Sequence, residues 1–129
     1  MPVIKNSQQC YEILKSVYDK DNIERLESCV LLLLNKANKY MGWVKISTGG
    51  MSGTVIDQRV IFQIVLRFNA HGIILSHNHP SGNTSPSEVD KTITRNLKSS
   101  SQILDIIFND HIIYTTDGYY SFADEGMIL

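Results

Sequence analysis

The chain has 129 residues, of which 43% are hydrophobic, enough for one domain around a single buried core. Its formal net charge of −1 argues against a nucleic-acid-binding surface. The charged fraction of 19% lies below the ~25% usual for soluble domains, and this favours a covered surface such as a homo-oligomer interface. We expect a single domain over residues 1–129, with a short N-terminal helix at about 7–19 and the core from about residue 24.

The sequence predicts neither a membrane span nor a signal peptide. The apolar run Val30–Leu34 ends at Asn35, far short of the ~18 residues that a membrane helix needs, and the N-terminus has no long apolar stretch. Cys10 and Cys29 form no C-x-x-C motif. We expect them to be buried thiols in a reducing cytoplasm, while the sequence alone leaves a disulfide open.

The first half of the chain predicts two helices and a hairpin. Cys10 and its apolar neighbours have helical spacing over Ser7–Tyr18. Strands at Cys29–Leu34 and Tyr40–Ile46 are separated by a polar turn, which indicates a hairpin. The glycine-rich segment Thr48–Thr54 is interpreted as a connector, narrowly favoured over a substrate-lining flap. Asp57 is expected to cap a helix that runs through Phe68.

The second half predicts further strands around another helix. A buried strand, Gly72–Leu75, leads into a polar segment and a helix, after which Ile103–Phe108 and His111–Thr115 have strand patterns. Asp117-Gly118 marks a tight turn before Tyr119–Phe122. Helices and strands alternate irregularly, so we expect an α/β (α+β) domain of three layers, with a mixed central sheet flanked by helices.

The segment between the buried strand and the helix carries the residues with chemical potential. His77 and His79 stand two apart at the strand's end, so both side chains point to one face of an extended backbone. Ser87 and Asp90 stand three apart, on one face of the following helix. Each residue alone has an ordinary structural role, but the joint pattern predicts a metal site. Two imidazoles and one carboxylate leave a fourth zinc position for water, as in catalytic sites.

The start of that helix is predicted from a capping box. Ser85 is expected to be the N-cap, with Pro86 at the first helical position and Glu88 three residues after the cap. An apolar stripe that would pack on the sheet follows at Val89, Ile93 and Leu97.

This segment resembles the JAMM (MPN+) metalloprotease signature, a distant Glu followed by His-x-His, seven residues, Ser, two residues and Asp. Here His79 is followed by the seven residues 80–86, then Ser87, two residues and Asp90. The form His-Asn-His-Pro-Ser-Gly at 77–82 further resembles the RadC-like JAB domain. The resemblance covers the chain from about residue 24 and implies a JAB/MPN (cytidine deaminase-like) fold.

The resemblance also implies roles for individual residues. Zn²⁺ would be held by His77, His79 and Asp90, and Ser87 would hydrogen-bond the developing oxyanion. The signature's glutamate would be Glu27, at the head of the strand that opens the sheet, rather than Glu24. Its carboxylate would act as the general base that takes a proton from a zinc-activated water. From the residues alone, Glu27 is an ordinary charged residue at a strand start.

The other histidines and a basic stripe are interpreted as structural. His71 lies about 20 Å from His77 by strand rise, too far to share a ligand site, and His111 stands beside a turn. The helix positions Lys91, Arg95 and Lys98 are expected to form a solvated face rather than a nucleic-acid contact.

Two hypotheses of function remain. The first is a cytoplasmic zinc metallopeptidase that hydrolyses a peptide or isopeptide amide bond of a peptide or protein substrate. The second is a non-catalytic binding or scaffold module of the same fold, to which the DNA repair association of the RadC name would attach. The complete signature favours the first, because a scaffold needs no proton shuttle and no open coordination position.

Overall fold

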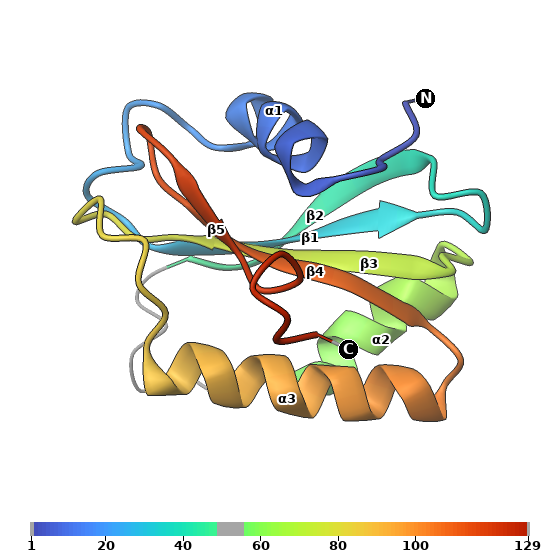
Figure 1. The fold of residues 1–129 in the computed structure, drawn as a ribbon. Coiled ribbons are helices and arrows are strands. Elements are labelled where there is room, and N and C mark those ends of the chain that lie inside the picture. The colour runs from blue at the N-terminus through green and yellow to red at the C-terminus, as the bar shows by residue number, and fades with distance from the viewer. Residues whose placement is uncertain (1, 49–55, 129) are drawn as a thin grey trace.

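The computed structural model describes residues 2–48 and 56–128. Within these residues five strands form one mixed sheet in the order β2-β1-β3-β4-β5, and three helices pack against it (Figure 1). The elements in chain order are α1 (Ser7–Val17), β1 (Ser28–Leu34), β2 (Tyr40–Thr48), α2 (Gln58–Arg67), β3 (Gly72–Asn78), α3 (Glu88–Ile103), β4 (Ile107–Tyr114) and β5 (Tyr119–Ser121). This arrangement confirms the predicted three-layer α/β class.

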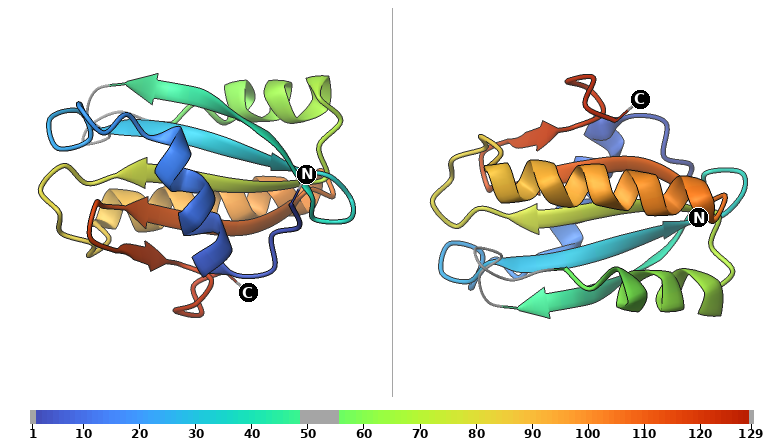
Figure 2. Two further views of the ribbon diagram at one scale, coloured as in Figure 1. Left: turned by 90° about the horizontal axis from the view of Figure 1, so that it is seen from above. Right: turned by 90° about the horizontal axis from the view of Figure 1, so that it is seen from below.

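The three layers enclose two apolar clusters. Helix α1 covers one face of the sheet, while α2 and α3 lie against the other, as the views from above and below show (Figure 2). Strand side chains alternate between the faces, so neighbouring leucines of β1 belong to different clusters: Leu32 packs under α1, and Leu31 under α2 and α3. Cys10 and Cys29 are buried free thiols in opposite clusters, which explains why they form no disulfide.

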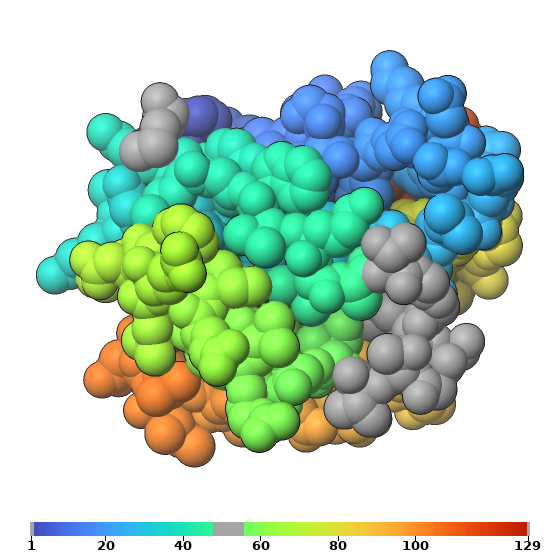
Figure 3. All heavy atoms as spheres, turned by 180° about the vertical axis from the view of Figure 1, so that it is seen from behind, coloured from blue at the N-terminus to red at the C-terminus, as the bar shows by residue number. Residues whose placement is uncertain are grey.

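The first two helices and the hairpin match their prediction closely. Asn6 caps α1 by accepting from the amide of Gln9, and Asp57 caps α2 by accepting from that of Arg59. Strands β1 and β2 pair antiparallel, as a hairpin requires. Strand β2 forms an edge of the sheet, and it lies above α2 on the face that is seen from behind (Figure 3).

Helix α3 begins two residues later than predicted. Its N-cap is Ser87: the hydroxyl accepts from the amide of Asp90 at 3.0 Å, and the Asp90 carboxylate accepts from the amide of Ser87 at 2.9 Å. Ser85 lies before the helix, and its amide donates to the side chain of Asn83. Two overlapping Ser-x-x-acidic sequences compete here, and the structure uses the second. Val89, expected in the buried stripe, is 42% exposed, and the buried face of α3 carries Asp90, Thr94, Leu97 and Ser101 instead.

The polar pair Asn109-Asp110 lies inside one strand and does not separate two. Strand β4 runs through it, with an irregularity where Ile73 and Ile74 of β3 pair with residues 108 and 110. Asp110 is tolerated in the sheet because its carboxylate accepts hydrogen bonds from the Ser121 hydroxyl and from two backbone amides. The predicted strand at Ile103–Phe108 is therefore wrong in its first part, since α3 extends to Ile103.

The topology gathers several chain segments at one end of the sheet. Strand β3 pairs antiparallel with β1 and parallel with β4, and α3 connects the two parallel strands. The start of β1, the end of β3 and the beginning of α3 consequently lie together (Figure 1). In register, His77 stands between Cys29 of β1 and Ile113 of β4.

Two expectations concern other parts of the chain. The predicted connector at Thr48–Thr54 lies, beyond Thr48, outside the described residues. Among the described residues, no helix has both the length and the apolar character that crossing a bilayer requires.

Candidate metal centre

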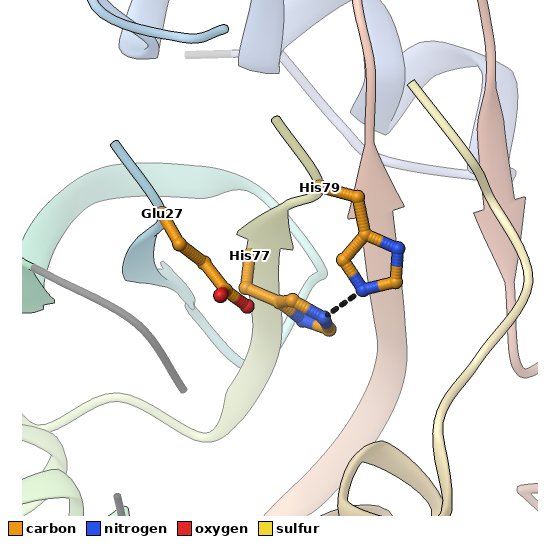
Figure 4. Close-up of side chains that lie close together, drawn as sticks. All are labelled: Glu27, His77 and His79. Atoms are coloured by element: carbon orange, nitrogen blue, oxygen red, sulfur yellow. Dashed lines mark hydrogen bonds between the residues drawn. The ribbon is translucent and has the colours of Figure 1, made fainter. Parts of the chain in front are cut away.

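Two histidines meet at the carboxyl end of β3. His77 is the penultimate residue of the strand and is completely buried, and His79 follows just after the strand's end. Their Nε2 atoms lie 3.0 Å apart (Figure 4). The alternation of an extended backbone places both rings on the same side, as the His-x-His spacing predicts.

Asp90 approaches the pair from the first turn of α3. Its Oδ1 lies 3.1 Å from Nε2 of His77, and its Oδ2 lies 3.3 Å from Nε2 of His79. The capping box holds this carboxylate in place, because Oδ2 also accepts from the amide of Ser87. The structure thus brings together the three residues that the sequence suggests as metal ligands.

Glu27 supplies a second carboxylate from the residue that precedes β1. One of its oxygens and one nitrogen of each histidine all lie within 4.8 Å of one another. Its side chain points toward His77 from the segment just before β1 (Figure 4). The histidine pair therefore has two candidate carboxylate partners, Asp90 and Glu27.

The separations of the ligand atoms suit a zinc ion. A tetrahedral ion with ligands at about 2.0–2.2 Å places its ligand atoms about 3.3–3.5 Å from one another. The contacts among His77, His79 and Asp90 span 3.0–3.3 Å, so small outward shifts are sufficient to accommodate an ion. Each histidine faces a different oxygen of Asp90, so binding through one oxygen also requires a small rotation of the carboxylate.

The hydrogen bond behind His79 shows which nitrogen is free. Its Nδ1 lies 2.6 Å from the backbone carbonyl oxygen of Asn83, which can only accept. Nδ1 therefore carries a hydrogen, so Nε2, which faces Asp90, is the nitrogen that the ring can offer to a metal ion in place of its proton. Metal-binding histidines generally donate from their second nitrogen in this way. The donor set of this site fits a divalent cation.

The charges of the site favour a cation among these atoms. Burial by itself would raise the pKa of Asp90, but hydrogen bonds from His77, His79 and the Ser87 amide outweigh it and hold that pKa far below its ordinary range. The hydrogen bond to Asp90 in turn raises the pKa of His79, against the lowering effect of burial. A proton or a metal ion between the histidine and the carboxylate is thus stabilised.

An open cleft reaches the site from solvent. It has a volume of about 310 Å³ and is lined by Glu27, His79, Pro80, Ser81, Ser87, Val89 and Asp90. A second cleft of about 240 Å³ adjoins it at His79, Pro80 and Ser81 and continues toward Thr115–Asp117. The proposed base and the proposed oxyanion donor, Glu27 and Ser87, line the first cleft together.

The comparison with known proteins identifies the family. Residues 4–127 match the RadC-like JAB domain. The chain belongs to this family. A UPF0758 protein of Flavobacterium johnsoniae is 46% identical over 97 residues, which cover 75% of this chain and 42% of that protein. One of Chlorobaculum parvum is 34% identical over 125 residues, covering 97% and 55%. UPF0758 protein YfjY of Escherichia coli is 40% identical over 102 residues, covering 79% and 64%.

These comparisons bear on the fold more than on the chemistry. The RadC-like chain spans about half the length of the curated relatives that it matches first. None of the three names states an activity. The comparisons confirm the RadC-like JAB family that the His-Asn-His-Pro-Ser-Gly segment suggests.

The RadC-like domain holds a further histidine at the site, which the sequence analysis interpreted as a structural residue beside a turn. His111 lies within β4, is completely buried, and has its Nε2 2.9 Å from Nδ1 of His77. Its other nitrogen, Nδ1, lies 2.6 Å from the Thr94 hydroxyl of α3. Burial lowers the pKa of His111 well below its usual value, so the ring is neutral. Thr94 was detectable from sequence, because it stands four residues after Asp90 on the same helix face.

Asn78 of the RadC-like domain was missed as well. It stands between the two histidines, and its side chain points to the opposite face of the sheet. Its Nδ2 donates to the carbonyls of Ile23 and Leu26, each at 2.8 Å, and its Oδ1 accepts from the amide of Ser28 at 2.7 Å. These bonds tie the segment that carries Glu27 to the strand that carries the histidines.

Proposed function

We propose that this chain is a zinc-dependent hydrolase of the JAMM type, which cleaves a peptide or isopeptide amide bond. The observation that carries the proposal is the position of Glu27, within 4.8 Å of the histidine pair and on the wall of an open cleft. A binding module of the same fold needs neither a second carboxylate at this position nor access from solvent.

His77, His79 and Asp90 are the residues that would hold the ion. Asp90 rather than Glu27 is the third ligand because its oxygens contact both histidine nitrogens, at 3.1 and 3.3 Å. When bound, zinc supplies Lewis acidity, polarising the substrate carbonyl and lowering the pKa of a coordinated water to about 7.

Glu27 acts as the proton carrier. Its carboxylate takes a proton from the attacking water and gives it to the amide nitrogen, so that the C–N bond breaks and the amine leaves neutral. The geometry supports this role because Glu27 lines the cleft and stands beside the histidine pair. One residue can serve both steps, since it returns to its ionised form after the second.

Ser87 stabilises the negative charge that develops on the substrate oxygen. Its hydroxyl oxygen accepts from the Asp90 amide, which fixes the oxygen at the edge of the cleft. The hydroxyl hydrogen then points away from that amide and is oriented to donate to the substrate. Ser87 therefore combines two roles, a helix cap and an oxyanion donor, that the sequence had divided between Ser85 and Ser87.

The shape of the surface supports an extended substrate such as a peptide or protein segment. The two clefts meet at His79, Pro80 and Ser81, so chain on both sides of a scissile bond has room to lie across the site. Two buried free thiols support a reducing compartment such as the cytoplasm as the place of action.

The test combines zinc content with cleavage. The full chain is loaded with one equivalent of zinc and incubated with a tryptic peptide mixture and a lysine ε-linked isopeptide, and new amino termini are followed by mass spectrometry. Wild type should cleave, and Glu27→Gln should keep its zinc while the rate falls by ~10²–10⁴-fold. Equal rates for both proteins would remove Glu27 from the mechanism. A zinc-loaded wild type that leaves both probes intact would instead favour the non-catalytic module.

A further inference from the structure

A chain of hydrogen bonds runs behind the histidine pair, away from the cleft. It leads from His77 Nδ1 to His111 Nε2 at 2.9 Å, from His111 Nδ1 to the Thr94 hydroxyl at 2.6 Å, and from that hydroxyl to the backbone carbonyl of Asp90 at 2.9 Å. His77 and His111 are 0% exposed and Thr94 is 2% exposed. The chain therefore starts at one proposed ligand and ends at the backbone of another.

The direction of each hydrogen bond in the chain follows from its final acceptor, the Asp90 carbonyl. The carbonyl oxygen of Asp90 can only accept, so the single hydroxyl hydrogen of Thr94 is donated to it. Thr94 must then accept from His111, whose Nδ1 carries the hydrogen. A neutral ring with its hydrogen on Nδ1 has a bare Nε2, and this atom accepts from Nδ1 of His77.

The same reasoning fixes the metal-facing atom of His77. With a hydrogen on Nδ1, His77 has only Nε2, the atom that faces Asp90 and His79, with which to coordinate an ion. His79 reaches the same state independently through its bond to the Asn83 carbonyl. Both histidines are thus prepared to coordinate through Nε2, one by the local loop and the other by a partner on a different strand.

The surroundings hold His111 in the orientation that this requires. The ring of Phe122 stacks on it with centroids 4.6 Å apart and planes 9° apart. Its backbone amide donates to the Asp110 carboxylate at 2.7 Å, which anchors the main chain at this point of β4. Rotation of the ring is therefore opposed from one face, while Thr94 and His77 hold its two nitrogens.

We propose that His111 and Thr94 are positioning residues which fix His77 as the Nδ1–H tautomer, so that Nε2 is free to coordinate the ion. This role rests on the zinc site of the proposed function, although it does not depend on hydrolysis. Residues that hydrogen-bond the second nitrogen of a metal-binding histidine typically contribute ~10–100-fold to metal affinity. His111, which is completely buried, acts only through His77.

The first experiment measures zinc affinity in matched variants. Thr94→Val removes the hydroxyl at nearly constant shape, and Thr94→Ser keeps it. The zinc dissociation constant is measured by competition with a chromophoric chelator, on protein whose metal-free melting curve shows that it is folded. We expect Thr94→Val to bind ~10–100-fold more weakly than wild type and Thr94→Ser to bind within a few-fold of it. Equal affinities for wild type and Thr94→Val would overturn the proposal.

The second measurement reads the tautomers directly and does not depend on any variant folding. In ¹⁵N-labelled metal-free wild type, two-bond ¹H–¹⁵N correlations of the imidazole rings distinguish Nδ1–H from Nε2–H. We expect the Nδ1–H pattern at His111 and a hydrogen on Nδ1 of His77. An Nε2–H pattern at His111 would contradict the inference even if zinc binds. A wild type that binds no zinc would overturn the proposed function itself. The chelator competition distinguishes that result from one in which zinc binds but His111 and Thr94 do not affect its affinity.

Discussion

The side chain of Asn78 holds the backbone on both sides of Glu27. It donates to the carbonyl of Leu26 and accepts from the amide of Ser28, at 2.8 and 2.7 Å. Because Asn78 stands between His77 and His79 in sequence, one residue ties the proposed base to the proposed ligands. The distance between the carboxylate of Glu27 and the histidine nitrogens is therefore set through the backbone.

Replacing Asn78 should separate metal binding from turnover. Asn78→Ala removes three hydrogen bonds to the segment before β1, and a base misplaced by about 1 Å can cost ~10²-fold in rate. We expect zinc content near that of wild type, a large loss of turnover and destabilisation of about 1–3 kcal/mol. Elemental analysis, cleavage rates and urea unfolding measure the three quantities. Full turnover in this variant would show that the Asn78 contacts do not position Glu27.

The two serines before α3 should behave differently from each other. Ser87→Ala removes the N-cap and the proposed oxyanion donor, so both stability, by about 1 kcal/mol, and turnover should fall. Ser85→Ala should change stability by less than about 0.5 kcal/mol, because Ser85 is exposed and precedes the helix.

Ser87→Gly separates the two roles of Ser87. Glycine is tolerated at an N-cap with a loss of only a few tenths of a kcal/mol. Turnover should nevertheless fall as far as in Ser87→Ala, since the hydroxyl is absent from both. Melting curves and rates for the zinc-loaded proteins decide the matter, and a fully active Ser87→Gly variant would remove Ser87 from the chemistry.

Asp110 should make stability fall as pH rises. Burial raises its pKa from 3.8 to about 6, although hydrogen bonds from Ser121, Ala123 and His111 oppose the shift. Between about pH 4 and pH 6 Asp110 keeps a proton in the folded chain that it has lost in the unfolded chain, so its contribution to the free energy of unfolding decreases across this interval. A shift of about 2 pKa units corresponds to about 3 kcal/mol.

Asp110→Asn should remove this dependence. Urea unfolding of metal-free wild type and variant at intervals from pH 4 to 7 gives the comparison, with a chelator present so that metal binding does not contribute. The raised pKa of His79 acts above pH 6.5 and the lowered one of Asp90 below pH 3.8, both outside the interval from pH 4 to pH 6. The lowered pKa of His111 makes stability rise with pH below 6.5, but it does so in both proteins and cancels in the difference between them. Parallel pH curves for the two proteins would show that Asp110 ionises normally in the folded chain.

Local patterns in the sequence were sufficient to locate most of the site. The apolar strand before His77 and His79 predicts their shared direction, and the three-residue spacing of Ser87 and Asp90 predicts their shared helix face. Glu27 could be singled out only by resemblance, because its approach to the histidines depends on the pairing of β1 with β3.

The features that sequence reasoning missed depend on contacts between elements. The helix start was misplaced because Ser85 and Ser87 both head a capping-box pattern. In the structure Ser87 is the N-cap, and its capping partner Asp90 also contacts the two histidines, which the local pattern does not show. His111 was interpreted as a structural residue at a strand start beside a turn, because Asn109 and Asp110 are polar. Asp110 instead lies inside the strand and finds its partners in β5 and in the segment after it. No pattern within β4 alone indicates that His111 faces Thr94.

The central claim is that His77, His79 and Asp90, and not Glu27, hold one zinc ion. Zinc per chain, measured by elemental analysis of wild type, Asp90→Asn and Glu27→Gln after equal loading and desalting, tests it most directly. Asparagine at position 90 retains an oxygen that can accept from the Ser87 amide, so the helix cap is preserved while the charged ligand is lost. The account predicts about one zinc in wild type and Glu27→Gln and a clear loss in Asp90→Asn. A wild type without zinc, or a Glu27→Gln variant that loses zinc while Asp90→Asn keeps it, would contradict the account.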